Sequence, residues 1–188
     1  CYFYPEFEKL YSNYLIEKVD QRNDSFSYVR ENFDNELFEN NRKKGENDDE
    51  IYQLIKNDSL EEFIIYVNSK DIKLSTSIKK SIFETNEYLV RNNPTLIEYS
   101  AFFGSIQIFK YLLDKGCELT PSLWLYAIHG ANPELIHFLE EKEIMPQDTT
   151  FRECLFESFK CHHNDIANYL QNNFYKFEHE FEKIRADY

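Results

Sequence analysis

The sequence predicts an all-α fold, an α-solenoid of stacked helix-turn-helix units. Its 188 residues include only 4 Gly and 5 Pro, too few for the many tight turns of an all-β protein. Apolar residues recur at helical spacing, most clearly in the second half of the chain. The dipeptides Gln107-Ile108, Glu134-Leu135 and Asp165-Ile166 lie 27 and then 31 residues apart. Periods in that range indicate stacked repeats of one supersecondary unit.

The unit is clearest over residues 94–119, PTLIEYSAFFGSIQIFKYLLDKGCEL. Thr95 followed by Glu98 forms a capping box, which predicts the start of a first helix. Gly104 permits the turn that reverses the chain, and Ser105 can cap a second helix. Gly116 stands where helices usually stop. Such a hairpin cannot bury its apolar face alone, so we expect neighbours of the same kind.

The N-terminal part has a different organisation. Residues 1–38 carry two apolar stripes at helical spacing, which predict an antiparallel helical pair. Residues 39–50, ENNRKKGENDDE, are polar and charged throughout, so we expect an exposed linker there.

Residues 51–173 contain the predicted repeats. Ser59 with Glu62 forms another capping box, and residues 70–93 have no firm assignment, although their apolar residues suggest packing. Further cap signals are Thr120-Pro121, Asn132-Pro133, and Thr150 with Glu153. Residues 174–188 carry Phe174, Phe177, Phe181 and Ile184 at helical spacing, which predicts a C-terminal capping helix.

The register from Ile97 to Leu119 resembles an ankyrin repeat. It has the family's paired small residues, turn glycine, apolar second helix and closing Lys-Gly: Ser100, Ala101, Gly104, Ile108, Phe109, Leu112, Leu113, Lys115 and Gly116. Residues 51–173, with PSLWLYAIHGANPELIHFLEE and CHHNDIANYL, resemble the divergent ankyrin-type domain of unknown function abundant in trichomonad-like parasitic protists. The resemblance implies a helical solenoid that acts as a non-enzymatic protein–protein interaction scaffold.

The chain departs from the ankyrin pattern in its loops. Ala101 and Ala127 are 26 residues apart, against about 33 for a full ankyrin unit. The missing residues are those that build the protruding β-hairpin fingers, and Thr120-Pro121 is not followed by Leu-His. We therefore expect recognition through the helical layers rather than through fingers.

Composition excludes several partners. The net charge of −13 disfavours nucleic acid and anionic membrane surfaces, because both need concentrated Lys and Arg. There is no run of about 18 apolar residues that would span a membrane. The four Cys are typical of reduced thiols, which predicts an intracellular, cytoplasmic protein. We expect a protein partner, no small-molecule substrate and no cofactor.

The Cys and His residues are the candidates for metal binding and for catalysis. Cys154, Cys161, His162 and His163 are the best metal candidates, but paired Cys and His ligands usually come from two elements with closer spacing. Core thiols and polar turn residues explain them as well, so we expect no bound zinc. With four glycines there is no GxGxxG motif or P-loop, and no His falls in a nucleophile motif. The sequence therefore predicts no enzyme activity.

The candidate protein-binding residues are Glu98, Phe102, Trp124 and Ile128. Aligning Ala101 with Ala127 places them in one stripe across two neighbouring first helices. An outward row of large apolar residues would mark an interface, and Trp is a favoured interface anchor. The competing interpretation is that residues 70–93 or a missing repeat cover this stripe and make it core.

The sequence leaves two functions open. The first is an interaction scaffold that presents an extended surface of stacked hairpins to a partner. The alternative is a structural capping segment of a longer ankyrin-repeat protein, continuing beyond Tyr188 and having no partner of its own.

Overall fold

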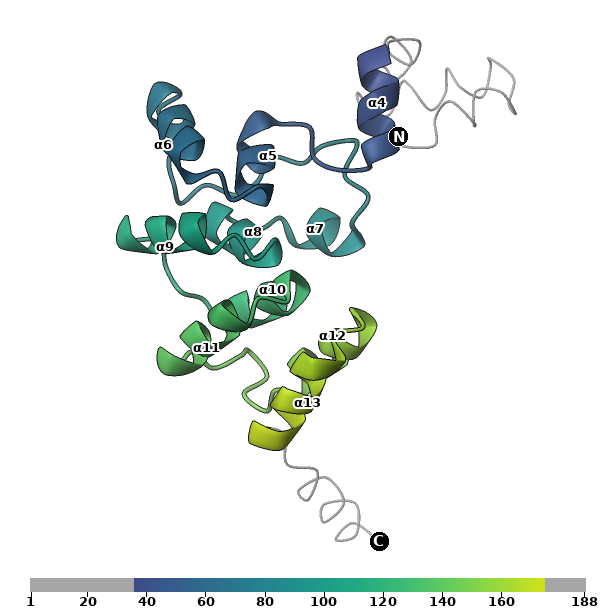
Figure 1. Ribbon diagram of the computed structural model, residues 1–188, viewed down its shortest axis with the longest axis vertical. Coiled ribbons are helices and arrows are strands. Elements are labelled where there is room, and N and C mark those ends of the chain that lie inside the picture. Colours follow the sequence, from purple (N-terminus) through teal and green to yellow (C-terminus); the bar gives the residue numbers. More distant parts are fainter. Residues whose placement is uncertain (1–35, 175–188) are drawn as a thin grey trace, which may run out of the picture. The chain divides into compact units, whose positions relative to one another are not determined.

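The computed structural model describes residues 36–174, in which short α-helices are joined by turns and loops (Figure 1). Their ten helices are α4 (Glu36–Lys44), α5 (Glu50–Lys56), α6 (Leu60–Ser69), α7 (Glu87–Asn92), α8 (Leu96–Phe102), α9 (Ile106–Asp114), α10 (Leu123–Gly130), α11 (Pro133–Glu141), α12 (Arg152–Lys160) and α13 (Asn164–Asn173). The same residues contain no strand, only an isolated antiparallel bridge between Ser77 and Thr95. The all-α prediction is confirmed for this part of the chain.

Residues 1–35 and 175–188 lie outside the described part. Nearly all of the helical pair predicted over residues 1–38 falls there, as does the capping helix predicted over residues 174–188. Within residues 36–174, no helix has the length and apolarity that crossing a bilayer requires.

The chain divides into two compact units. The first comprises Cys1–Gln53 and Ile78–Asn93, and the second comprises Leu54–Ser77 and Pro94–Tyr188. The boundary therefore falls within α5. The sequence placed residues 51–173 in one domain, whereas the structure groups residues 78–93 with the N-terminal unit.

The first unit corrects the prediction of an exposed linker over residues 39–50. Residues 36–44 form α4, and the side chain of Asn47 is buried. Asn47 Nδ2 donates to the carbonyl of Lys79 at 2.9 Å, and Gln53 Nε2 donates to the carbonyl of Asn47 at 2.6 Å. These bonds satisfy polar groups that a linker would leave to water, so a polar composition did not imply exposure here.

Residues 78–93, the larger part of the unassigned stretch 70–93, supply part of the core of this unit. Phe83 is buried and its ring lies edge-on to that of Phe38, with centroids 5.1 Å apart. Asn86 caps α7, because its side chain accepts from the N–H groups of Tyr88 and Leu89.

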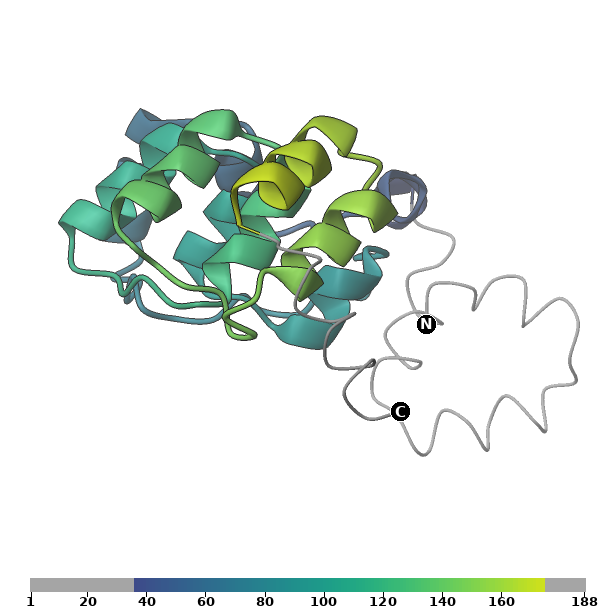
Figure 2. The ribbon, with the colours of Figure 1, turned by 90° about the horizontal axis from the view of Figure 1, so that it is seen from below.

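In the second unit, helices that follow one another in the chain pack in pairs, and we call each pair a layer. Helices α8 and α9 pack together, as do α10 with α11 and α12 with α13. The first helices form one row, in which α8 contacts α10 and α10 contacts α12. The layers follow one another in Figure 1, and Figure 2 shows them from the α12–α13 end.

Aromatic side chains connect the second helices of these layers. Phe63 of α6 lies edge-on to Tyr111 of α9, and Phe109 of α9 lies edge-on to Phe138 of α11. The ring centroids are 6.1 and 5.7 Å apart, within the range of favourable aromatic pairs. The second helices thus form a second row beside the first.

Helix caps confirm some sequence signals and correct others. The capping box of Thr95 and Glu98 is present, and Asn132 caps α11 with Pro133 in the first turn. Ser59 and Ser105 make no side-chain cap.

Helix α9 is capped by Asp58, which lies in the turn between α5 and α6. The Asp58 carboxylate accepts from the N–H groups of Gln107 and Ile108 at 3.1 and 3.0 Å, while Ser105 Oγ donates to the carbonyl of Ile55. Likewise, no side-chain cap comes from Phe151, the N-cap residue of α12; Asp148 accepts from the N–H of Glu153 instead.

Candidate functional site

The stripe predicted to bind a partner is largely core. Trp124 and Ile128 are 0% exposed and Phe102 is 9% exposed, so the expectation of an outward apolar row is wrong. Phe151 and Phe174 cover Trp124, with ring centroids 4.9 and 6.1 Å from the indole. The competing interpretation of a buried stripe is correct, and the side chains of Phe151 and Phe174, at the ends of α12 and α13, provide cover for Trp124.

Glu98, the polar member of the stripe, is half-buried and used in structure. Its Oε2 accepts from the backbone N–H of Thr95 at 2.8 Å, which completes the capping box. Its Oε1 accepts from the hydroxyl of Ser122, at the start of α10. The carboxylate therefore joins the first helices of two layers.

The four metal candidates from the sequence do not form one cluster. Cys154 is buried in α12, His162 is exposed, and Cys161 and His163 are partly exposed. The structure instead brings Cys161 to His129 of α10 and Glu157 of α12. The ligand atoms of these three residues all lie within 4.8 Å of one another.

His129 lies at the centre of this group. Its Nε2 is 3.1 Å from Glu157 Oε1, and its Nδ1 is 3.4 Å from Cys161 Sγ. The ring of Phe102 stacks on the imidazole, with centroids 4.7 Å apart and planes at 26°. The other oxygen of Glu157 pairs with Lys160 Nζ at 2.8 Å. Each side of the imidazole is thus held by a defined neighbour.

Burial sets the charge states in the group. Desolvation lowers the pKa of His129 from 6.5, although Glu157 opposes the shift, so the imidazole is neutral at neutral pH. Desolvation raises the pKa of Cys161, and the nearby Glu157 adds to the shift. Cys161 also follows the C-terminus of α12, where the helix dipole disfavours an anion. A protonated thiol is a poor nucleophile, so Cys, His and Glu in contact do not here indicate covalent catalysis.

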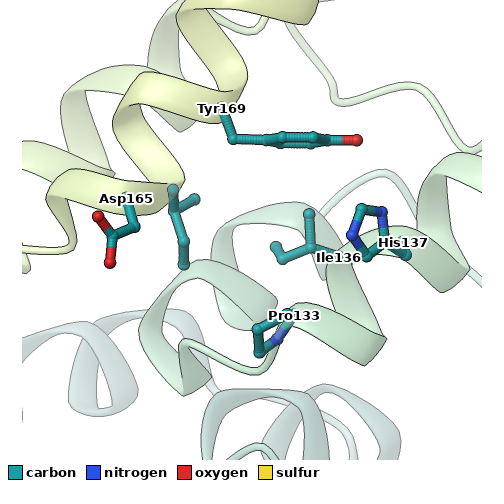
Figure 3. A pocket seen from close by; sticks show the side chains of 6 residues that line it. Pro133, Ile136, His137, Asp165 and Tyr169 are labelled. Atoms are coloured by element: carbon teal, nitrogen blue, oxygen red, sulfur yellow. The ribbon is translucent and has the colours of Figure 1, made fainter.

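An open cavity of about 170 Å³ lies between the second helices α11 and α13. Its lining is mainly apolar and comprises Pro133, Ile136, His137, Asp165, Ile166 and Tyr169. Figure 3 shows the Tyr169 ring of α13 reaching across the cavity toward Ile136 and His137 of α11. We call this feature the α11–α13 groove.

Glu140 holds one wall of the groove. Tyr169 donates its hydroxyl hydrogen bond to Glu140 Oε2, which also lies 3.3 Å from His137 Nδ1. The hydrogen bond to Glu140 raises the pKa of Tyr169 to about 12. The rings of His137 and Tyr169 meet edge-on at 5.4 Å, so the wall is braced from both helices.

Sequence reasoning missed the groove, although its signal was present. The dipeptides Glu134-Leu135 and Asp165-Ile166 established the spacing of the second helices. The same alignment places Ile136 and Ile166 on neighbouring helices, but it does not show that a hollow is left between them.

Comparisons with protein-family models, with curated proteins and with solved structures found no match to this chain.

Proposed function

We propose that this chain is a non-enzymatic protein-interaction module of ankyrin type, which takes an apolar side chain of its partner into the α11–α13 groove. The groove carries the proposal, because it is an apolar hollow that opens to solvent. The first-helix stripe has no such role, since it is buried.

Recurring turns support the repeat architecture. The residue between the two helices of each pair has a left-handed backbone, at Asp58, Gly104, Ala131 and His162. A second left-handed residue follows the second helix at Asp71, Gly116 and Glu143. In each of these latter turns the next N–H bonds back to a carbonyl five residues earlier, as from Cys117 to Leu112. One turn geometry at corresponding places is what stacked repeats of one unit produce.

The size of the groove favours one side chain over a metabolite. Pockets for drug-sized ligands usually enclose about 300–1,000 Å³. A cavity of about 170 Å³ is closer to the roughly 150 Å³ that accommodates a benzene ring. A single Leu, Ile, Met or Phe from a protein partner therefore suits the site better than a small-molecule substrate.

Charge favours a basic residue beside that anchor. Asp165 is exposed at the rim, Glu140 lies behind Tyr169, and the whole chain carries a net charge of −13. Complementary charges steer association and disfavour wrong partners. The proposed ligand is an apolar residue flanked by Lys or Arg.

A random-peptide library displayed on phage tests this proposal. Peptides selected on the chain should share a large apolar residue next to Lys or Arg. They should bind Ile166→Glu at least about tenfold more weakly, because a carboxylate in the groove disfavours an apolar side chain. Ile65→Glu is the matched control, since Ile65 is 69% exposed on α6, outside the groove. Peptides that bind both variants equally would show that the α11–α13 groove is not the binding site.

A second function, the structural capping segment of a longer repeat protein, is favoured by α12. Phe156 and Phe159 on that helix are 51% and 48% exposed, as expected for a face that further helices cover. This alternative predicts that the same selection yields no groove-dependent peptide.

A further inference from the structure

Three potential metal ligands meet between α10 and α12, away from the α11–α13 groove. Glu157 and Cys161 are four residues apart, so they lie one above the other on the same side of the helix. His129, in the last turn of α10, faces both of them. We propose that His129, Glu157 and Cys161 form a zinc-binding site, a role that goes beyond the proposed partner binding.

The ligand atoms of the three residues lie within 4.8 Å of one another, close enough for one ion to draw them together. Zinc lies about 2.0–2.3 Å from its N, O and S ligands, which places tetrahedral ligand atoms roughly 3.3–3.8 Å apart. The contacts of His129 with Glu157 and Cys161 are 3.1 and 3.4 Å. They use different ring nitrogens, and a metal takes only one. Binding therefore exchanges one of these contacts for coordination, through a rotation of the imidazole or of the Cys161 side chain.

The ligand types select zinc among the common biological cations. One imidazole, one thiol and one carboxylate offer N, S and O donors, whereas Mg²⁺ and Ca²⁺ prefer oxygen alone. Coordination converts the Cys161 thiol to a thiolate, and its proton passes to solvent. Three protein ligands leave the fourth position to water.

Neighbouring side chains orient the ligands. Phe102 stacks on the imidazole, and Lys160 binds Glu157 Oε2 while Oε1 faces His129. Such outer contacts fix ligand orientation in metal sites. The side chains of His129 and Glu157 are each 13% exposed, so little water competes for them, while the partly exposed Cys161 gives an ion access.

This proposal replaces the sequence-based expectation of a protein without zinc. That expectation considered Cys154, His162 and His163 beside Cys161. It did not include His129, which is 32 residues away from Cys161 in the sequence.

Titration of the full chain, stripped with a chelator, tests the site with Zn²⁺ and with Co²⁺ as a spectroscopic probe. We expect one ion per chain by calorimetry, and a near-ultraviolet thiolate-to-cobalt absorption band. Cys161→Ser should abolish the band and weaken Zn²⁺ binding by about tenfold or more. Cys117→Ser is the matched control, because Cys117 is also a partly exposed free thiol but lies outside the cluster. His162→Ala is a second control, because His162 is an exposed histidine outside the cluster and its removal should leave Zn²⁺ binding unchanged.

Circular dichroism in the absence of metal establishes whether each variant is folded. His129→Ala is a second test variant. If it does not fold, the near-isosteric Cys161→Ser still provides a valid comparison. Absence of stoichiometric binding by the folded chain would overturn the proposal. Binding that Cys161→Ser leaves unchanged would overturn it equally.

Discussion

The indole N–H of Trp124 donates a hydrogen bond to the backbone carbonyl of Ile144, in the loop that follows α11. The side chain is 0% exposed, and the rings of Phe151 and Phe174 pack against it. A buried Trp needs a partner for its N–H, and this carbonyl provides one. Trp124 therefore holds the α12–α13 pair to the rest of its unit instead of anchoring a partner.

Replacing Trp124 with Ala should destabilise the fold strongly. Truncation leaves a large cavity and an unsatisfied carbonyl, so we expect a loss of about 3–5 kcal/mol in the free energy of unfolding, measured in urea. Phe159→Ala is the control, because Phe159 is half-exposed and should change stability by less than about 1 kcal/mol. A Trp124→Ala variant as stable as that control would contradict the burial of this residue.

Asp58 should stabilise α9 although it belongs to another helix pair. Its carboxylate binds the N–H groups of Gln107 and Ile108, and its own φ is 51°. Asp58→Ala should cost about 2–4 kcal/mol, from the lost cap and the left-handed backbone together. Asp58→Gly loses the cap but relieves the backbone, so it should cost about 0.5–2 kcal/mol.

Asp58→Asn separates these terms further, since Asn retains one acceptor and tolerates the left-handed region. Thermal unfolding should therefore rank the variants Asn, Gly and Ala in order of increasing loss. An Asp58→Gly variant as stable as the wild type would show that the Asp58 cap does not stabilise α9.

Gly130→Ala should destabilise the protein, although alanine has a higher helix propensity than glycine. Alanine is favoured over glycine in helices by about 1 kcal/mol. A Cβ at Gly130 would, however, lie 2.3 Å from the carbonyl oxygen of Ala101 and 2.8 Å from the nitrogen of Gly104. Both contacts are backbone, so the first helices α8 and α10 must move apart.

We expect a lower melting temperature for Gly130→Ala, whereas Gln107→Ala, at an exposed helical position, should be near neutral. A stabilised Gly130→Ala variant would disprove the close approach of these two helices.

Cys154 should be inert to alkylation in the native protein. Burial raises its pKa to about 12, with Asp148 and Glu153 adding to the shift. Among the Cys residues that the structure describes, iodoacetamide at pH 8 should therefore label Cys117 and Cys161 before Cys154, and Cys154 only in urea, as peptide mapping by mass spectrometry can show.

The same shift predicts alkaline instability. The unfolded thiol ionises near pH 9 and the folded one near pH 12, so the contribution of Cys154 is complete below pH 9 and lost as the pH rises toward 12. In the labelling experiment at pH 8, alkylation of Cys154 in the native protein as fast as that of Cys117 would show that Cys154 is not buried.

Local patterns predicted much of the helical fold. The capping box of Thr95 and Glu98 and the cap of Asn132 were readable because donor and acceptor are close in sequence. The cap of α9 was not, since Asp58 reaches it from 49 residues away. The polar residues 39–50 predicted a linker because composition does not reveal the partner that buries Asn47.

The candidate sites depended even more on tertiary contacts. Periodicity placed Trp124 on a definite helical face, but not the aromatic rings that cover it. His129 and Cys161 belong to different layers, and their meeting depends on how α10 packs on α12. Helical spacing alone could not establish that contact.

Nuclear magnetic resonance of the ¹⁵N-labelled chain, titrated with a peptide from the library selection, tests whether the α11–α13 groove binds the partner. We expect the changes in chemical shift to concentrate on α11 and α13, around Ile136, Ile166 and Tyr169, and to vanish in Ile166→Glu. Changes confined to other helices, with the groove signals unmoved, would contradict the assignment of the α11–α13 groove as the partner-binding site.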